Sequence, residues 1–345
     1  MSLLNGKIGD FFGLDIGTSG IRLAKIAHPS NSLQTYAYMP IDSGTALSDS
    51  KADQQKLAQA VKSLVDKSGI RTKNVAVGLP SQRVFTAVVD IDRLDKDELS
   101  KTIQLQADSL IPTPIAESKL DWALIGSSPQ DKTKVEVLLS SVPNNYVEAR
   151  LDLLENIGLN VIAFEPDSLT LVRALIAPDA PQAQMILDMG NISTDLVIVL
   201  NGSPRLIRSI PTGYDAIIKS AVQNLNIDEA QAKQFVSKFG LNPQKLEGQI
   251  FHAISGTVDM LMTEVDKSIK FFSSRYQGTK IERIIVSGNA SSLPDFPVYL
   301  ANKFVINVEV GNAWRNVSFS PDRQNELLTI SSQFGVAVGL AERHA

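Results

Sequence analysis

The sequence of 345 residues contains no cysteine and only three histidines. Without cysteine, the chain has no disulfide, thiol nucleophile or thiolate metal site. His28, His252 and His344 are scattered along the sequence, which argues against a His-based catalytic triad or a His-rich zinc site. The net charge is −4, whereas a general nucleic-acid binder usually presents a basic face, so we expect no nucleic-acid partner.

Long apolar runs are also missing from the sequence. None approaches the ~18 consecutive residues that a membrane span needs. We expect no signal peptide in residues 1–10 and no membrane-binding amphipathic helix at the end of the sequence. A role at a membrane would therefore depend on a partner. The hydrophobic fraction of 43% is sufficient for well-packed cores, and the length predicts about two domains.

One stretch that is present carries much of the interpretation, residues 12–23 (FGLDIGTSGIRL). It predicts a buried strand that ends in a glycine- and hydroxyl-rich turn, followed by a second strand. Backbone N–H groups converge in such a turn, and glycine lets a ligand approach them closely. Asp15 and Arg22 flank the turn. The N–H groups, the glycines and the two charged residues together suit the binding of a polyphosphate and its metal. The alternative is an ordinary β-hairpin with a Gly-rich turn.

The same pattern recurs at residues 186–196 (ILDMGNISTDL). Asp15 and Gly17 correspond to Asp188 and Gly190, an offset of 173 residues, which is about half the chain. Two matching turns in two halves predict a pseudo-symmetric pair of domains that face one cleft. Asp15 and Asp188 could then hold one hydrated Mg²⁺, which prefers oxygen ligands and retains most of its waters.

Between and after these turns, hydrophobic periodicity predicts an alternation of strands and helices. Residues 83–158 form a compact β-α-β-β-α block that could be an inserted subdomain. We expect residues 42–50 to be a polar loop. We expect one terminal helix over residues 328–343, where Gly335 and Gly339 suggest a close contact with another helix. Trp122 and Trp314 are interpreted as packing residues.

The order of these features resembles the actin-like ATPase superfamily, an α/β fold with two pseudo-symmetric ribonuclease H-like domains. Residues 13–22 resemble its first phosphate loop, 188–196 its second, and 284–294 its adenosine loop. Residues 165–166 and 334–341 resemble its two connecting helices. Any one of these matches is weak, but five in the right order are specific.

The resemblance implies a division of the chain into subdomains. It places subdomain 1A in residues 1–82 and 159–182, an inserted subdomain 1C in 83–158, and subdomain 2A in 183–215 and 281–327. Subdomain 2B would comprise residues 216–280. The last segment, 328–345, would be a helix that returns to 1A.

Within the superfamily, residues 90–126 are most similar to the PilM family of cytoplasmic type IV pilus assembly proteins. The segments LDKDEL (94–99), QADSLIP (106–112) and LDW (120–122) carry this resemblance. It implies an ATP-binding adaptor at the inner face of the cytoplasmic membrane. The adaptor would bind the N-terminal peptide of a PilN-like bitopic membrane protein in a groove beside the inserted subdomain, and would couple it to pilus motor ATPases.

The resemblance also implies roles for single residues, with ATP or ADP and Mg²⁺ as ligands. Asp15 and Asp188 would orient Mg²⁺ through water, and Glu165 would lie near an attacking water, which makes Glu165 and Asp188 the candidate catalytic residues. Residues from both turns and the adenosine loop would contact the nucleotide: Gly17, Thr18, Ser19, Gly20, Arg22, Gly190, Asn191, Gly213, Gly288 and Asn289.

Some positions depart from the superfamily pattern. Asn289 and Ala290 follow Gly288 where consecutive glycines are usual, and Tyr214 follows Gly213 where a second glycine is usual. We therefore expect weakened nucleotide binding and at most slow ATP hydrolysis. Two alternatives remain open: a small-molecule kinase of the same superfamily, and an FtsA-like protein that self-associates into filaments through head-to-tail contacts.

Overall fold

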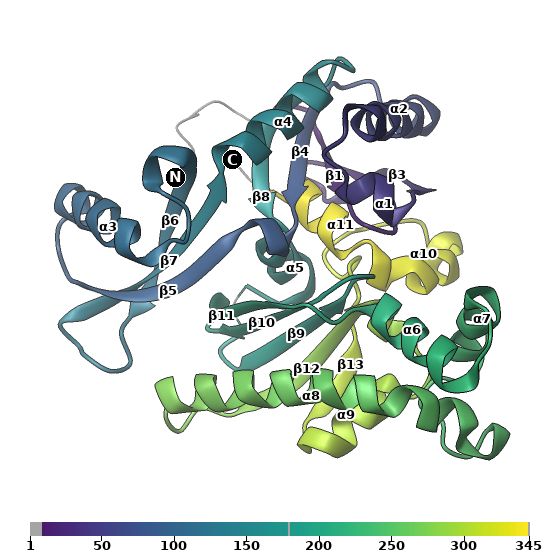
Figure 1. The fold of residues 1–345 in the computed structure, drawn as a ribbon. Helices are drawn as coiled ribbons and strands as arrows, with labels where there is room; N and C mark the ends of the chain where they lie inside the picture. Colours follow the sequence, from purple (N-terminus) through teal and green to yellow (C-terminus); the bar gives the residue numbers. More distant parts are fainter. Residues whose placement is uncertain (1–8, 179, 344–345) are drawn as a thin grey trace.

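The computed structural model describes residues 9–178 and 180–343, and within these ranges two five-stranded sheets share one strand order (Figure 1). In the first sheet the order is β3-β2-β1-β4-β8, and in the second it is β11-β10-β9-β12-β13. In each sheet, the three strands that come first in the sequence pair antiparallel with one another. The next strand, β4 or β12, pairs parallel with the central strand, β1 or β9. The pseudo-symmetric α/β fold predicted from the repeated turn is thus confirmed.

The strands have the following bounds. The first sheet contains β1 (Phe12–Ile16), β2 (Gly20–Ala27), β3 (Ser32–Pro40), β4 (Asn74–Leu79) and β8 (Asn160–Pro166). The second contains β9 (Ala183–Met189), β10 (Thr194–Leu200), β11 (Ser203–Ile210), β12 (Ile281–Gly288) and β13 (Asn307–Val310).

Two helices lie between the sheets, α5 (Asp167–Leu175) and α11 (Gly335–Ala341) (Figure 1). Their apolar residues pack against strands of both sheets in one core cluster. A side-chain carbon at Gly339 would collide with the backbone of Thr170, so only glycine allows the two helices to approach this closely. The close helix contact predicted at this position is confirmed.

The single terminal helix predicted over residues 328–343 is wrong. The chain instead forms α10 (Gln324–Ile330), a 3-10 turn (Ser331–Gln333) and α11. At the break, Ser331 and Ser332 bond other segments of the chain. The Ser331 hydroxyl accepts from the Ala313 amide at 2.8 Å, and the Ser332 carbonyl accepts from the Ser287 hydroxyl at 2.9 Å.

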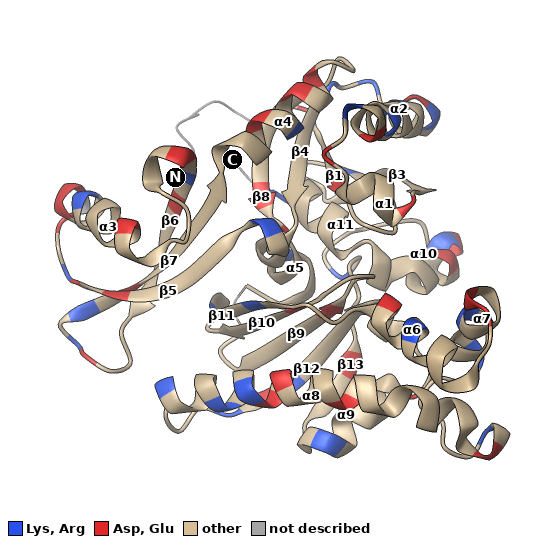
Figure 2. Cartoon of the chain, viewed as in Figure 1, with Lys and Arg blue, Asp and Glu red and all other residues tan. Residues whose placement is uncertain are grey.

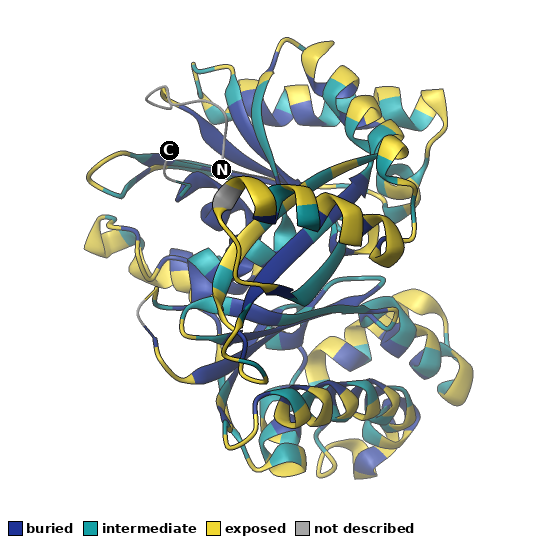
Figure 3. Cartoon of the chain, turned by 90° about the vertical axis from the view of Figure 1, so that its left-hand side faces the viewer, coloured by how far each residue is buried: buried dark blue, intermediate teal, exposed yellow. Residues whose placement is uncertain are grey.

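Further helices cover the outer faces of the two five-stranded sheets. They are α2 (Lys51–Ser68) and α4 (Asn144–Glu155) on the first sheet, and α6 (Tyr214–Leu225), α7 (Glu229–Phe239), α8 (Gln249–Arg275) and α9 (Phe296–Phe304) on the second. Figure 3 shows buried strands in the middle and helices whose outward faces are exposed. Within the described ranges, no helix combines the length and the apolar composition that crossing a bilayer requires.

Residues 42–50, which were expected to be a loop, contain the short helix α1 (Ser43–Leu47). The Asp42 carboxylate accepts from the Thr45 amide at 3.0 Å and caps the helix start. The loop prediction is therefore wrong in its centre, because the capping residue outweighed the polar composition.

A third, antiparallel sheet is built from residues of the predicted insertion, with the order β5-β7-β6. Its elements are β5 (Phe85–Asp92), α3 (Lys96–Leu110), β6 (Ser118–Ser127) and β7 (Lys134–Pro143). Helix α3 packs on the sheet through residues such as Leu99 and Ile103. The small α+β unit is confirmed as part of the fold, whereas the subdomain boundaries given above stay predictions.

A buried ionic cluster joins this small unit to the second half of the molecule. Glu136 of β7 is fully buried and accepts from Arg205 of β11 at 2.9 Å and from Arg275 at the end of α8 at 2.8 Å. The Tyr276 hydroxyl donates to the same carboxylate at 2.6 Å, and Arg275 also bonds Asp90. Charged residues gather toward this end of α8 (Figure 2). The insertion is thus held to the second half by contacts, although its chain is continuous with the first half.

Candidate functional site

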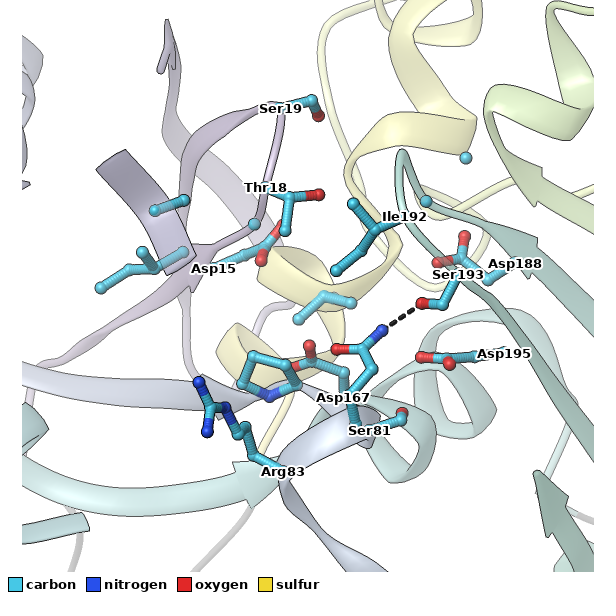
Figure 4. A pocket seen from close by; sticks show the side chains of 18 of the residues that line it. Asp15, Thr18, Ser19, Ser81, Arg83, Asp167, Asp188, Ile192, Ser193 and Asp195 are labelled. Atoms are coloured by element: carbon cyan, nitrogen blue, oxygen red, sulfur yellow. Dashed lines mark hydrogen bonds between the residues drawn. The ribbon is translucent and has the colours of Figure 1, made fainter. Parts of the chain in front are cut away.

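A pocket with a volume of about 400 Å³ lies where the two glycine turns face each other; we call it the central pocket (Figure 4). Residues of both halves line it, so neither half forms it alone. Nine of the predicted site residues are among the lining residues: Asp15, Gly17, Thr18, Ser19, Arg22, Asp188, Gly190, Gly288 and Asn289.

The two turns have the same backbone construction. In the first, the Gly17 amide donates to the Gly20 carbonyl at 3.1 Å. In the second, the Gly190 amide donates to the Ser193 carbonyl at 2.8 Å. These bonds connect equivalent positions, 173 residues apart, so the repeat read in the sequence is also a repeat of hydrogen bonding.

In the first hairpin, Asp15 stands opposite Arg22 in the strand register. The Arg22 Nη1 lies 3.7 Å from the Asp15 carboxylate, and the guanidinium stacks over the Tyr38 ring at 5.0 Å. Burial raises the pKa of Asp15 to about 6, and the positive charge of Arg22 opposes that rise. The first turn therefore carries an acid and its own counter-charge.

In the second hairpin, the residue opposite Asp188 is Asp195, another acid. Burial raises the pKa of Asp188 to about 7, and the charge of Asp195 adds to the rise. Burial also raises the pKa of Asp195, although the Ser209 hydroxyl, which donates to it at 2.7 Å, opposes this. Sequence reasoning did not select Asp195, although it lies within the repeated motif.

Asp167, the first residue of α5, is a further acid that the sequence analysis did not select. Its buried Oδ1 has no hydrogen-bond partner among the described residues. Burial raises the pKa of Asp167 well above its ordinary value, and the nearby acids Asp15, Asp195 and Asp188 add to the effect. Its sequence signal was only its place directly after residues 165–166, at a helix start, where an acid is ordinary.

Glu165, the predicted residue near the attacking water, does not line the central pocket. Its carboxylate accepts from Arg173 at 2.8 and 3.1 Å and is also paired with Arg343. Side chains alternate along β8, and its neighbours Phe164 and Pro166 face a separate groove described below. The catalytic role stays a prediction, but the structure brings Asp167, not Glu165, into the pocket.

Gly20, Asn191 and Gly213 do not line the pocket either, but they support the residues that do. The Asn191 side chain accepts from Asn289 at 2.9 Å and so links the second turn to the adenosine-type loop. A side-chain carbon at Gly213 would collide with the backbone of Asn191. Their nucleotide contacts stay predictions.

Gly288 closes the pocket beside the second turn. Its φ is +62°, and a side-chain carbon there would lie 2.5 Å from the Met189 carbonyl oxygen and 3.0 Å from the Asp188 carboxylate. Glycine is thus required at this position for two reasons, backbone conformation and space.

The donor set suits a metal that is held through water. Among the described residues, no group of three His, Asp or Glu side chains is placed to ligate a metal directly. A cation among these acids would lower their raised pKa values and would give the Asp167 oxygen a partner. The predicted hydrated Mg²⁺ fits this arrangement.

A second hollow, of about 370 Å³, lies between the inserted unit and the first sheet; we call it the apolar groove. One wall consists of strands β6 and β7, including Trp122 and Ala123. The other consists of Leu79, Phe164 and Leu169. Trp314 is buried, and the partly buried Trp122 packs against the core between the inserted sheet and α3, so both serve packing as expected. Trp122 also contributes to the lining of the groove.

A family model described as "Type IV pilus assembly protein PilM" matches residues 13–345. The chain belongs to the PilM family of type IV pilus assembly proteins.

Solved structures agree with this fold. A chain of a PilM-PilN type IV pilus biogenesis complex is similar over 96% of this chain and 97% of that chain, with 24% identity and a TM-score of 0.82. The ethanolamine utilization protein EutJ from Carboxydothermus hydrogenoformans matches 96% of this chain and 88% of its own, with 14% identity and a TM-score of 0.58.

MreB5 of Spiroplasma citri bound to AMPPNP matches 97% of this chain and 95% of its own, with 12% identity and a TM-score of 0.56. The chain therefore has the actin-like ATPase fold, and the predicted family is confirmed.

Proposed function

We propose that this PilM-family protein is a nucleotide-binding cytoplasmic adaptor of the type IV pilus machinery. It binds the N-terminal cytoplasmic peptide of a PilN-like inner-membrane protein in the apolar groove. It holds ATP or ADP with Mg²⁺ in the central pocket and connects the membrane protein to pilus motor ATPases. The observation that carries the adaptor role is the groove between the inserted unit and the first sheet.

The walls of the groove suit an apolar or amphipathic peptide. Leu79, Phe164 and Leu169 are placed by the first sheet and by α5, and Ala123 and Leu138 line the opposite wall on the inserted unit. Burying apolar side chains in such a space supplies the driving force, while β6 is an edge strand with backbone groups open on one side. A solved relative of this fold is a PilM-PilN complex, which supports the same partner class here.

A matched pair of variants tests the groove. Ala123 is exposed and lines the groove, so Ala123→Glu places a charge against the bound peptide without disturbing the core. Leu105 lies on α3 and is 80% exposed outside the groove, so Leu105→Glu is the control. Calorimetry with a synthetic PilN-like N-terminal peptide should show about tenfold or greater weakening for the first variant only. Equal affinities would overturn the groove assignment.

The nucleotide site rests on the two turns. Backbone amides from Gly17 to Gly20 would hold the terminal phosphates, and Gly190 would approach them from the other half. Asp15 and Asp188 would hold Mg²⁺ through water, and Gly288 would approach the adenosine. When bound there, Mg²⁺ would neutralise phosphate charge. In MreB5, a relative with the same fold, the bound ligand is AMPPNP or ADP.

Hydrolysis should be slow in this pocket. Glu165 is occupied by Arg173 and Arg343, and Asp167 holds a proton more tightly than an ordinary acid because of its surroundings. The candidate residue for the attacking water is thus held by two arginines outside the central pocket. Asp167→Asn should alter the metal dependence of nucleotide binding.

Thermal unfolding tests the nucleotide site. Asp15→Ala and Asp188→Ala should abolish the rise in melting temperature that Mg-ATP gives the unmodified chain. Asp108→Ala, at an exposed position on α3, is the control. Equal melting shifts in all variants would contradict the metal role. ATP turnover that depends on a sugar or another metabolite would favour a kinase, and nucleotide-dependent sedimentation would favour a filament former.

A further inference from the structure

Two arginines of residues 83–158, Arg83 and Arg150, line one end of the central pocket. Arg83 is the last residue of the 3-10 turn Ser81–Arg83, which comes after β4, and Arg150 lies on α4. Both guanidinium groups lie over the ring of Tyr146, which also lines the pocket, at 5.3 Å and 5.6 Å from its centroid. Two like charges thus share one aromatic ring.

Neither arginine forms an ion pair within the part of the chain that the structure describes. Arg150 is only 8% exposed, yet its Nη1 has no hydrogen-bond partner, and its Nη2 reaches only the Tyr146 hydroxyl at 3.4 Å. A buried cation without a carboxylate partner is costly. Stacking on Tyr146 offsets part of that cost, but the ring serves two cations.

The pocket is therefore electrically divided. Asp188 and Asp195 lie at one side, and Arg83 lies at the side away from them (Figure 4). The acidic side attracts a metal, whereas the arginine side attracts an anion. Arg83 is exposed and offers donors that a ligand can reach, and the buried Arg150 adds positive charge behind it.

We propose that Arg83 and Arg150, assembled on Tyr146, form a binding site for a phosphate-type dianion at the end of the central pocket remote from Asp188. Guanidinium groups match tetrahedral phosphate oxygens with paired, charge-assisted hydrogen bonds. A dianion also balances two cations, which a single carboxylate does not. The site goes beyond the proposed nucleotide function, because it needs neither glycine turn.

Two sources supply such a dianion, free inorganic phosphate and a phosphate monoester on a second ligand. Both present the same oxygens to Arg83. The monoester differs because one of its oxygens carries carbon and needs additional space. Inorganic phosphate and glycerol 3-phosphate are therefore the two probes.

The experiment is calorimetric titration of the full chain with inorganic phosphate, alone and with saturating Mg-ADP. Phosphate should bind in both cases, because ADP occupies the glycine turns and not the arginines. Arg83→Gln and Arg150→Gln should each weaken binding by about tenfold or more. Arg71→Gln, which removes the same charge at an exposed position outside the pocket, should leave it unchanged.

Melting temperatures test separately whether the substitutions disturb the fold. Arg83 is exposed, so its replacement should not affect the fold, and Arg150→Met keeps the length of the buried stem. Without phosphate, Arg150→Met should melt at or above the temperature of the unmodified chain. Phosphate should raise the melting temperature of the unmodified chain. This rise should be absent in Arg83→Gln and in Arg150→Met.

Retention of phosphate binding in both arginine variants, or its complete displacement by ADP, overturns the site. If Mg-ADP does not bind at all, the nucleotide proposal fails while the phosphate titration alone still tests the arginines. Equal binding of glycerol 3-phosphate supports the site and assigns it to a phosphorylated ligand. Preference for inorganic phosphate supports the site and assigns it to free phosphate.

Discussion

The β1–β2 and β9–β10 hairpins have the same register and turn bond, but they differ in the residue that faces the first acid. Arg22 stands opposite Asp15, whereas Asp195 stands opposite Asp188. One hairpin therefore contains a cation–anion pair and the other contains two anions. The two hairpins share a backbone structure but differ in charge, because Arg22 and Asp195 occupy equivalent positions.

The carboxyl pKa values follow this difference. Asp15, with Arg22 beside it, has a pKa of about 6, and Asp188, with Asp195 beside it, has a pKa of about 7. Burial raises both pKa values. The neighbouring charge, Arg22 or Asp195, then decreases or increases that rise. The second half of the pocket is consequently the part that gains more from a bound cation.

The largest expected effect is on the pH dependence of stability without ligands. Both acids have folded-state pKa values above the ordinary 3.8, so the folded chain binds more protons between about pH 4 and pH 7. The free energy of unfolding should therefore fall as the pH rises through this window and level off above it. Asp188 alone should account for about 3 kcal/mol of this fall in the free energy of unfolding.

Urea unfolding between pH 5 and pH 8, with a chelator present, measures this slope. Asp188→Asn should flatten it more than Asp15→Asn does. Equal slopes in both variants would remove the proposed difference between the hairpins.

Arg22→Met should break the first hairpin's charge balance. The pKa of Asp15 should rise further, because the charge that opposes its burial is lost. The variant should lose about 2 kcal/mol of unfolding free energy at pH 8 and less at pH 5, where Asp15 is protonated. A loss of the same size at both values would mean that Arg22 acts through packing on Tyr38 instead.

Asp195→Asn should make the second hairpin more like the first. The pKa of Asp188 should fall toward its ordinary value, because the neighbouring negative charge is gone, while the amide oxygen still accepts from Ser209. Stability should rise by about 1 kcal/mol at pH 8 and stay unchanged at pH 5. Carbon NMR of the aspartate carboxyls checks the shift, with Asp108→Asn as the surface control.

Ser209→Ala should give the smallest effect. It removes the hydroxyl that bonds Asp195 at 2.7 Å, so the pKa of Asp195 should rise. The expected loss is about 1 kcal/mol or less at pH 8, measured by urea unfolding. An unchanged titration of Asp195 would mean that this hydroxyl does not support the charged form.

Much of the central pocket could be predicted from the sequence, because its turns are local. A strand, an acid and a glycine turn are read from about ten consecutive residues, and the second copy strengthens the first. Asp15, Gly17, Asp188 and Gly190 were found in this way. The resemblance selected Glu165 and did not select Asp167, which lies two positions further along at a strand–helix junction.

The sequence by itself determined the repeated hairpins, the family and the β-α-β-β-α character of the insertion, since periodicity and turn residues act over short distances. Only the tertiary structure decided what each acid faces. It placed Asp195 against Asp188, turned Glu165 toward Arg173, and brought Arg83 and Arg150 onto one ring. Charges interact through space, and the separations that set their energies exist only once the chain is folded.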